Sequence, residues 1–304
     1  MTPLRLVPAS VRDGAEPLER RFGGTAFVLA GGGSHGAVQV GMLRALLAAG
    51  VRPDFVVGTS VGAINGVFLA GDPTPEGVER LSRVWIGLTR HEIYPNFALG
   101  WVRSLLRGRA HVVDPRGLRR ILAGNLPMSR LEQGAVPACV VTADLRDGSE
   151  VVLSHGDAVD AILASAAIPG IFPPAHIDGR MLIDGALAKN AAISTAVALG
   201  AARVIVLPTG FGCAVKSPPR SVIAMAVQVV SLLLARQLAD EAERFAPLLP
   251  IAVVPPLCPL GVSSFDFSHS RRLIADAAES TEQWIAGGGL QVRTIPMTLA
   301  PHTH

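Results

Sequence analysis

The stretch LAGGGSHGAVQVG, residues 29–41, joins an apolar segment to an amphipathic one through three consecutive glycines. The residues before it, TAFVLA at 25–30, are typical of a short buried strand, and apolar side chains then recur mostly at helical spacing from Val38 to Leu47. A second apolar run, DFVVG at 54–58, predicts another strand and leads into a helix rich in small side chains. This strand–helix–strand–helix order predicts an α/β fold with a parallel sheet and right-handed crossovers.

The glycine loop is open to three interpretations. Gly31, Gly33 and Gly36 satisfy the dinucleotide-binding pattern GxGxxG, in which N–H groups at a helix start hold a pyrophosphate. That site also needs an acidic residue at the end of the second strand, to bind the ribose. Asp54 is the only nearby acid, and it begins that strand, at the opposite edge of the sheet. The spacing therefore argues against a dinucleotide-binding module and leaves a loop that only packs, or one that stabilises charge during a reaction.

The end of the second strand carries GTSVG, residues 58–62, which is a GxSxG nucleophile elbow between a strand and a helix. The elbow and the glycine loop both leave the carboxyl edge of the sheet, where parallel α/β folds place their sites. We therefore predict that Ser60 is a nucleophile. The predicted oxyanion hole is formed by N–H groups of Gly32, Gly33 and Ser34.

A nucleophilic serine needs a base, and two residues are candidates. Asp184, in MLIDGA, ends a predicted strand among apolar neighbours, so partial desolvation is expected to raise its pKa and let it accept a proton. His269 follows the chain order of an α/β-hydrolase triad, but it lies at a predicted helix start with no turn to present it. Asp178, in the similar sequence IDGR, is typical of a plain turn.

The rest of the chain continues the α/β pattern without an internal repeat. Residues 25–290 are expected to form one domain, with an N-terminal extension at 1–24 and a tail at 291–304. Its further predicted elements are a strand pair at 137–154, a helix from Asp157 to Ala166, a proline-rich loop at 167–174, a hairpin ending at Asp184, strands at 203–208 and 251–254, and helices at about 219–246 and 268–286.

The composition is that of a globular protein: 49% of the 304 residues are hydrophobic and 17% are charged. The longest apolar run, residues 222–235, is shorter than the ~20 residues of a spanning helix, so we expect a buried core helix there. Residues 1–24 lack the continuous apolar core of a secretory signal. The cysteines are far apart and no histidines pair at helical spacing, which predicts no disulfide framework, no metal site and a reducing, cytoplasmic location.

Four motifs, GGGSHG, GTSVGAING, AIPGIFPP and LIDGALAKN, occur in the order and approximate spacing of the patatin-like phospholipases, which this chain resembles over roughly residues 25–210. The resemblance implies a three-layer α/β/α fold with a mostly parallel central sheet, and hydrolysis of acyl esters in lipids without a metal or cofactor. The nucleophile of the family matches Ser60, its catalytic aspartate matches Asp184, and its oxyanion loop matches the glycines from Gly31. The remaining motif positions are His35, Gly36, Gly58, Gly62, Gly185 and Ala186.

The reaction that this resemblance implies is attack by Ser60 on an acyl carbonyl, followed by hydrolysis of the acyl-enzyme, with Asp184 moving the proton in both halves. His35 departs from the family, which usually has Arg or Lys there, so a charge that titrates near neutrality replaces a fixed one. This predicts that activity on anionic lipids falls as pH rises through the His35 transition, and that His35→Arg flattens the fall. Asn190 matches the family, whereas Ala192 replaces a common proline, a difference expected to affect packing only.

Residues 80–130 are strongly basic, with ten arginines against Glu92 and Asp114, a formal charge of +8 in a chain of +3. The segment also holds four of the aromatic side chains: Trp85, Tyr94, Phe97 and Trp101. It is either an ordinary solvated helical face or a cap over the cleft that binds anionic membrane surfaces peripherally. The low overall charge and the lack of a recognised motif argue against nucleic-acid binding.

Overall fold

The computed structural model describes residues 6–8, 22–95, 111–189, 191–210, 222–260 and 262–291. Its centre is a nine-stranded sheet in which seven strands follow the order β1-β5-β4-β3-β2-β8-β9, while β7 pairs with β4 and with β6. The strands are β1 (Leu6–Pro8), β2 (Thr25–Leu29), β3 (Phe55–Thr59), β4 (Ala138–Asp144), β5 (Glu150–Leu153), β6 (Ala175–Ile177), β7 (Arg180–Asp184), β8 (Arg203–Leu207) and β9 (Ile251–Val253).

The five central strands, β4, β3, β2, β8 and β9, are parallel, whereas the pairs that involve β1, β5, β6 and β7 are antiparallel. The prediction of an α/β fold with a mostly parallel central sheet is therefore confirmed. Parallel strands are buried on both faces, and the side chains of β2 illustrate this: Phe27 and Leu29 join one apolar core, and Ala26 and Val28 join the other.

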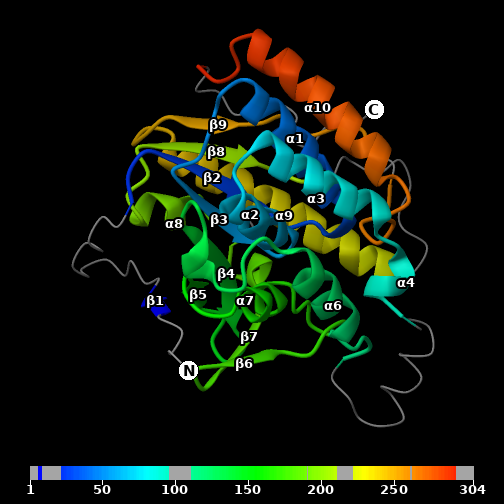
Figure 1. Cartoon of the computed structure of the whole chain (residues 1–304). Coiled ribbons are helices and arrows are strands. Elements are labelled where there is room, and N and C mark those ends of the chain that lie inside the picture. The colour runs from blue at the N-terminus through cyan, green and yellow to red at the C-terminus, as the bar shows by residue number, and fades with distance from the viewer. Residues whose placement is uncertain are drawn as a thin grey trace.

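Helices cover the two faces of the sheet (Figure 1). The core on one face includes residues of α1 (Gly36–Ala48), α2 (Val61–Gly71), α3 (Pro75–Gly87), α6 (Arg116–Asn125), α7 (Ala158–Ser165) and α10 (Ser270–Ala286), and the short α4 (Arg90–Ile93) ends beside it. The core on the other face includes residues of α8 (Ile193–Ala198) and α9 (Val222–Phe245). The order of layers is therefore helices, sheet, helices, as the family resemblance implied.

Local sequence signals agree with the observed elements in the middle of the chain. Asp157 accepts a hydrogen bond from the N–H of Asp160 at 2.8 Å and so caps α7, and the turn between β6 and β7 has positive φ angles at Asp178 (48°) and Gly179 (74°). The proline-rich residues 167–174 contain no helix. The hairpin therefore ends β7 at Asp184, where the sequence predicted it.

The expectation that residues 222–235 form a buried core helix is wrong. Five apolar side chains of α9 are between 39% and 55% exposed: Met225, Val229, Val230, Leu232 and Leu233. A 24-residue helix is about 36 Å long, whereas a five-residue strand spans about 17 Å, so α9 is longer than the strands that it covers. Among the side chains of α9 that the structure describes, the buried ones are those of Leu238 and Ala242, in its later part. Across the ranges that the structure describes, no helix has both the length and the apolar character to cross a bilayer.

Strand β1 lies inside the segment that the sequence left as an extension. Its three residues pair antiparallel with β5, with Val7 opposite Val152. An edge strand of this length is held by backbone hydrogen bonds and has no alternating pattern of its own, so periodicity gave no signal for it.

Candidate active site

Ser60 sits on a sharp turn between β3 and α2. Its backbone has φ 55° and ψ −121°, a positive φ that is uncommon for a residue with a side chain and is found where surrounding structure enforces it. The turn brings backbone segments so close that a Cβ atom at Gly58 would meet the carbonyl oxygen of Gly62, and one at Gly62 would meet that of Leu29. The two motif glycines are therefore required, because a residue with a Cβ atom would not fit at either position. The elbow that they permit presents the Ser60 hydroxyl at the carboxyl edge of the sheet.

Strand register brings Asp184 to Ser60. Thr59 is paired with Val141 on β4, and the next residue of β4, Thr142, is paired with Asp184 at the end of β7. The hydroxyl of Ser60 donates a hydrogen bond of 2.6 Å to Oδ2 of Asp184. Gly185 allows this close approach, because a Cβ atom there would meet the carbonyl oxygen of Val141.

The Asp184 carboxylate is almost fully enclosed, with 4% of the residue exposed. Burial raises the pKa of Asp184 to about 6, although hydrogen bonds from the Ser60 hydroxyl and from the N–H of Ala186 (2.9 Å) act in the opposite direction. A carboxyl group with this pKa is ionised at neutral pH and basic enough to receive a proton from a hydroxyl during a reaction. Tyr94 lies nearby, and burial, with the charge of Asp184 adding to it, raises the pKa of this phenol to about 12.

The glycine loop presents fewer free donors than the sequence predicts. Gly32 and Gly33 have φ angles of 156° and 61°, and no described residue accepts a hydrogen bond from either N–H group. The N–H of Ser34, the third predicted donor, is already bonded to the carbonyl oxygen of Ser264 at 2.8 Å, so this part of the prediction is wrong. Gly31 uses its carbonyl oxygen to accept a 2.6 Å hydrogen bond from Thr209.

The backbone carbonyl groups of residues 262–264 form hydrogen bonds with the glycine loop. The Ser34 hydroxyl donates to the carbonyl oxygen of Ser263 at 3.0 Å, and Nε2 of His35 lies 2.8 Å from the carbonyl oxygen of Val262. Burial lowers the pKa of His35, and the hydrogen bond to Val262 only partly opposes this. The ring is therefore neutral at neutral pH, and the titration expected there is displaced to lower pH.

A buried polar chain connects the glycine loop to the elbow helix, and sequence reasoning missed it. Nε2 of Gln39 on α1 donates to the carbonyl oxygens of Ala30 (2.8 Å) and Leu207 (2.9 Å). Nδ2 of Asn65 on α2 donates to Oε1 of Gln39 (2.8 Å), and Nε1 of Trp85 on α3 donates to Oδ1 of Asn65 (2.9 Å). Gln39 and Asn65 are fully buried, so these bonds fix the starts of α1 and α2 relative to each other.

Ser165 is a second residue that the sequence did not single out. Its hydroxyl accepts a 2.8 Å hydrogen bond from the N–H of Ser60 and donates one of 2.6 Å to the carbonyl oxygen of Val141. Ser165 is completely buried at the end of α7. It therefore supports the strained backbone of the elbow, a role visible only once α7 is placed beside β3.

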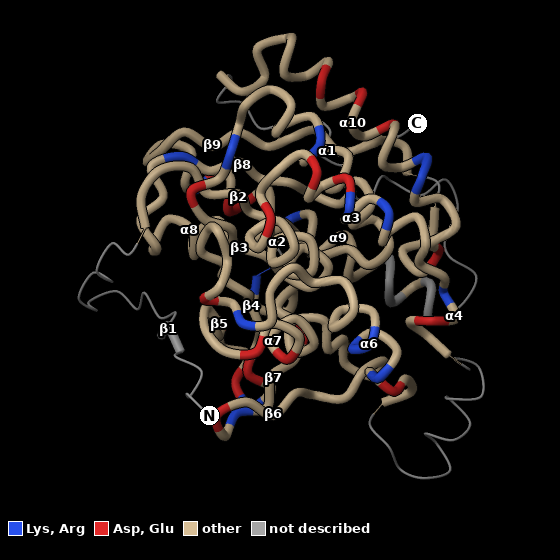
Figure 2. The backbone as a smooth tube through the Cα atoms, viewed as in Figure 1, with Lys and Arg blue, Asp and Glu red and all other residues tan. Residues whose placement is uncertain are grey.

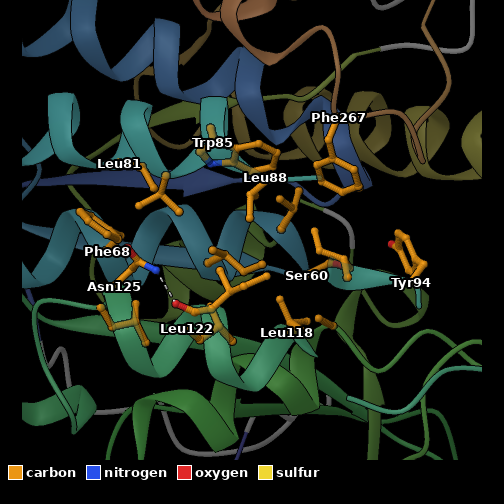
Figure 3. Close-up of a pocket in the computed structure, with 18 of the residues that line it drawn as sticks. Ser60, Phe68, Leu81, Trp85, Leu88, Tyr94, Leu118, Leu122, Asn125 and Phe267 are labelled. Atoms are coloured by element: carbon orange, nitrogen blue, oxygen red, sulfur yellow. Dashed lines mark hydrogen bonds between the residues drawn. The ribbon is translucent and has the colours of Figure 1, made fainter. Parts of the chain in front are cut away.

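A cavity of about 770 Å³, its open mouth included, begins at Ser60 and Gly33 and runs between α2, α3 and α6 (Figure 3). Its described lining contains no charged side chain. The apolar walls come from α2 (Val61, Ile64, Phe68), α3 (Leu81, Val84, Trp85), α6 (Leu118, Ile121, Leu122) and residues near them (Leu88, Ile93, Tyr94, Leu126, Ala166, Ile168, Phe172, Phe267), and Asn125 adds a polar side chain. A lining of this kind suits a hydrocarbon group held beside Ser60.

The basic segment 80–130 contributes to this cavity with its apolar side chains. Trp85 and Tyr94, which an interfacial surface would expose, are only 3% and 7% exposed, so that part of the membrane-surface interpretation is wrong. Their rings pack on Phe267, at centroid distances of 6.1 and 6.3 Å. Phe97 and Trp101 lie outside the described residues. Figure 2 marks the positions of the arginines on α3 and α6 along the backbone, and these residues are exposed: Arg80, Arg83, Arg116, Arg119 and Arg120.

The alternative candidates lie elsewhere. His269 is at the start of α10, where its ring is 3.6 Å from the carboxylate of Asp266. Asp54 directly precedes β3 and accepts a 2.6 Å hydrogen bond from the N–H of Thr25, at the opposite edge of the sheet from Gly33. The part of the chain that the structure describes holds no group of three His, Cys, Asp or Glu side chains arranged for a metal ion. Asn190 is outside the described residues, and Ala192 is buried before α8.

Sequence comparison with known proteins identifies the family to which the chain belongs. A family model described as "Patatin-like phospholipase" matches residues 27–197. Patatin-like phospholipase domain-containing protein 6 of Homo sapiens is 30% identical over 188 residues, 61% of this chain and 13% of that protein. An uncharacterized NTE family protein of Mycobacterium tuberculosis is 31% identical over 198 residues, 61% of this chain and 31% of that one. The chain thus spans less than a third of the length of these relatives.

Two solved structures resemble the chain at low identity. VipD from Legionella pneumophila has a TM-score of 0.45 and 12% sequence identity, and the match covers 88% of this chain and 67% of that one. Human GIVD cytosolic phospholipase A2 has a TM-score of 0.45 and 11% identity, with 88% and 62% of the two chains covered.

Proposed function

Because this chain belongs to the patatin-like phospholipase family, we propose that it is a serine acyl hydrolase that cleaves acyl esters of lipids. Ser60 is the nucleophile in this proposal and Asp184 is its general base. The observation that carries the proposal is the 2.6 Å hydrogen bond from the Ser60 hydroxyl to a buried carboxylate whose pKa is raised to about 6. A hydroxyl at a strained elbow with such a base beside it fits nucleophilic catalysis better than a packing role.

In the first half of the reaction, Oγ of Ser60 attacks the carbonyl carbon of the ester and its proton passes to Oδ2 of Asp184. The carbonyl oxygen becomes an oxyanion, and the N–H groups of Gly32 and Gly33 supply donors; each such donor stabilises a transition state by about 3–4 kcal/mol. The tetrahedral intermediate then expels the alcohol, which takes the proton back from Asp184. The acyl group remains on Ser60.

In the second half, a water molecule attacks the acyl-enzyme carbonyl through its oxygen, and Asp184 accepts a proton from this water. Collapse of the second tetrahedral intermediate breaks the bond to Oγ, which recovers its proton from Asp184. The products are a free fatty acid and the original enzyme.

The residue after the nucleophile adds a further donor to the oxyanion hole. It is Val61, the first residue of α2, whose N–H belongs to the first helical turn and lies beside the same oxyanion.

A fluorophosphonate probe with an alkyl chain tests the assignment, because it phosphonylates an activated serine. We expect the probe to label Ser60 alone, Ser60→Ala to abolish labelling, and Asp184→Asn to slow labelling and ester turnover by about a thousandfold or more. Asp178→Asn is a matched control, since Asp178 lies in an Asp-Gly sequence on an exposed turn. Labelling at another serine, or an unchanged rate in Asp184→Asn, would contradict the proposal.

Peripheral contact with an anionic membrane surface is a further part of the proposed function. It is supported by the arginine excess of residues 80–130, whose described helices α3 and α6 form walls of the cavity. Sedimentation with vesicles that contain or lack acidic lipid should show binding only to the acidic vesicles, and less of it as salt rises. Equal sedimentation with both kinds of vesicle at low and high salt would exclude this electrostatic contact.

A further inference from the structure

The cavity beside Ser60 has a direction that α2 defines. Val61, Ile64 and Phe68 recur at helical spacing along one side of α2 and form its floor. Figure 3 places Phe68 at one end of the cavity and Tyr94 at the other, with Ser60 between them and nearer to Tyr94. Leu81, Trp85 and Leu88 lie along one wall, and Leu118 and Leu122 lie along the other.

The far end of the cavity differs chemically from its middle. Asn125, the last residue of α6, adds an amide there, and its Nδ2 donates to the carbonyl oxygen of Ile121 at 2.8 Å. Asn125 is exposed, whereas Phe68 and Leu122 are buried at 4% and 3% exposure. Apolar contact is therefore continuous from Ser60 to Phe68 and gives way to water beyond Asn125.

The helix also gives the length of this apolar path. Phe68 follows Ser60 by eight positions, and a rise of 1.5 Å per residue makes this about 12 Å. An extended hydrocarbon chain with C–C bonds of about 1.5 Å advances about 1.25 Å per carbon, so about ten carbons fill the path.

We propose that this cavity binds the acyl chain of the ester attacked by Ser60 and limits the length of chain that it can bury. Each added carbon buries more of the chain, up to about ten carbons, where Phe68 ends the cavity. The proposal rests on the acyl hydrolase function above and adds a chain-length limit to it. The occupant is the acyl chain, because the apolar path from Ser60 to Phe68 starts at the nucleophile and the described lining holds no charged side chain to pair with a head group.

The direct test is a series of p-nitrophenyl esters with acyl chains of two to sixteen carbons, measured below their aggregation limits. We expect kcat/KM to rise by up to about fourfold per methylene, the value for full burial, and to level off at about ten carbons. Rates are expressed per active site titrated with the fluorophosphonate probe, so that unfolded protein does not distort the profile. A profile that is flat, or that rises steadily to sixteen carbons, would overturn the proposal.

Two variants and one control locate the limit. The break is the chain length at which kcat/KM levels off. Phe68→Ala removes the ring at the far end of the cavity and should move this break to longer chains by about two to four carbons. Ile64→Trp fills the cavity one turn from Ser60, about 6 Å away, and should move the break to about five carbons. Leu69→Ala is the matched control, because Leu69 is adjacent and 1% exposed but does not line the cavity, and its break should match the wild type.

The outcomes separate this proposal from the function on which it depends. No labelling and no turnover of any ester would remove the acyl hydrolase function itself. Turnover of esters with the same break in Phe68→Ala and Leu69→Ala would remove the chain-length proposal alone. Dependence on the alcohol chain in a series of alkyl acetates, with a flat acyl series, would assign the cavity to the leaving group instead.

Discussion

The Ser60 hydroxyl and the Asp184 carboxylate, 124 residues apart in sequence, are joined by a 2.6 Å hydrogen bond. Both residues are buried, at 7% and 4% exposure, and Ser60 lines a cavity with apolar walls. Because the carboxylate has lost most of its hydration, its proton affinity is set by Ser60, the N–H of Ala186 and burial.

The pH profile should report Asp184. Only the ionised carboxylate accepts the proton of Ser60, and its pKa is raised to about 6, so kcat/KM for an uncharged ester should be constant above about pH 7 and fall tenfold per pH unit below about pH 6. His269→Ala should keep the same profile, because His269 pairs with Asp266. A transition near pH 7 that disappears in His269→Ala would favour a histidine base.

Asp184→Asn should be at least as stable as the wild type above pH 7, although it is inactive. The folded-state pKa of about 6 lies above the ordinary 3.8, so the folded protein holds this proton more tightly than the unfolded chain does. The contribution of Asp184 to wild-type stability should therefore fall as pH rises from about 4 to 6, by at most about 3 kcal/mol.

Urea unfolding of the wild type and Asp184→Asn at pH 4.5 and pH 8 measures this difference. Asp178→Asn, on an exposed turn, serves as the control and should show the same pH dependence as the wild type. A large loss of stability in Asp184→Asn at pH 8 would mean that the charged carboxylate stabilises the fold.

Ser165→Ala should lower kcat more than it changes KM. The substitution leaves the N–H of Ser60 and the carbonyl oxygen of Val141 without their common partner, at a cost of about 1–3 kcal/mol in the free energy of unfolding. Ser154→Ala is a matched control, because Ser154 is also buried but its hydroxyl bonds to His155. Wild-type kcat in Ser165→Ala would show that the elbow keeps its conformation without this contact.

The Gln39–Asn65–Trp85 chain predicts strong coupling between two substitutions. Asn65→Ala breaks bonds to Gln39, Trp85 and the carbonyl of Gly36, and should cost about 3 kcal/mol, whereas Trp85→Phe removes one bond and should cost about 1–2 kcal/mol. The double variant should be less destabilised than the sum, by about 1 kcal/mol in urea unfolding. Additive effects would show that the two side chains act independently.

The His35 hypothesis changes once the side chain is placed. Since burial lowers its pKa, the preference for anionic over neutral lipid esters should be constant between pH 7 and pH 9. His35→Arg should raise that preference by adding a permanent charge beside the glycine loop. Parallel turnover of an anionic and a zwitterionic lipid across this range measures both effects, and a preference that falls between pH 7 and pH 8 in the wild type would contradict them.

Much of the fold and the central pair of the site could be predicted from the sequence. The motif GTSVG specifies its own backbone, because only glycines at positions 58 and 62 fit the close approach around Ser60. Asp184 could be predicted because a strand, an Asp-Gly pair and apolar neighbours are local signals. Order along the chain then placed Ser60 at the carboxyl edge of the parallel strands. Asp184 reaches the same edge through strand register, because β7 runs antiparallel to β4 and pairs Asp184 with Thr142.

Tertiary structure alone decided which groups around that pair are free, supported or exposed. The N–H of Ser34 donates to the carbonyl oxygen of Ser264, and the N–H of Ser60 at the elbow donates to the hydroxyl of Ser165. The aromatic side chain of Trp85 is buried in a wall of the cavity. Each of these facts depends on segments that are far apart in sequence and adjacent in space. Periodicity and spacing report the backbone within one element, whereas hydrogen-bond partners and burial depend on which elements pack together, and that information exists only after the chain has folded.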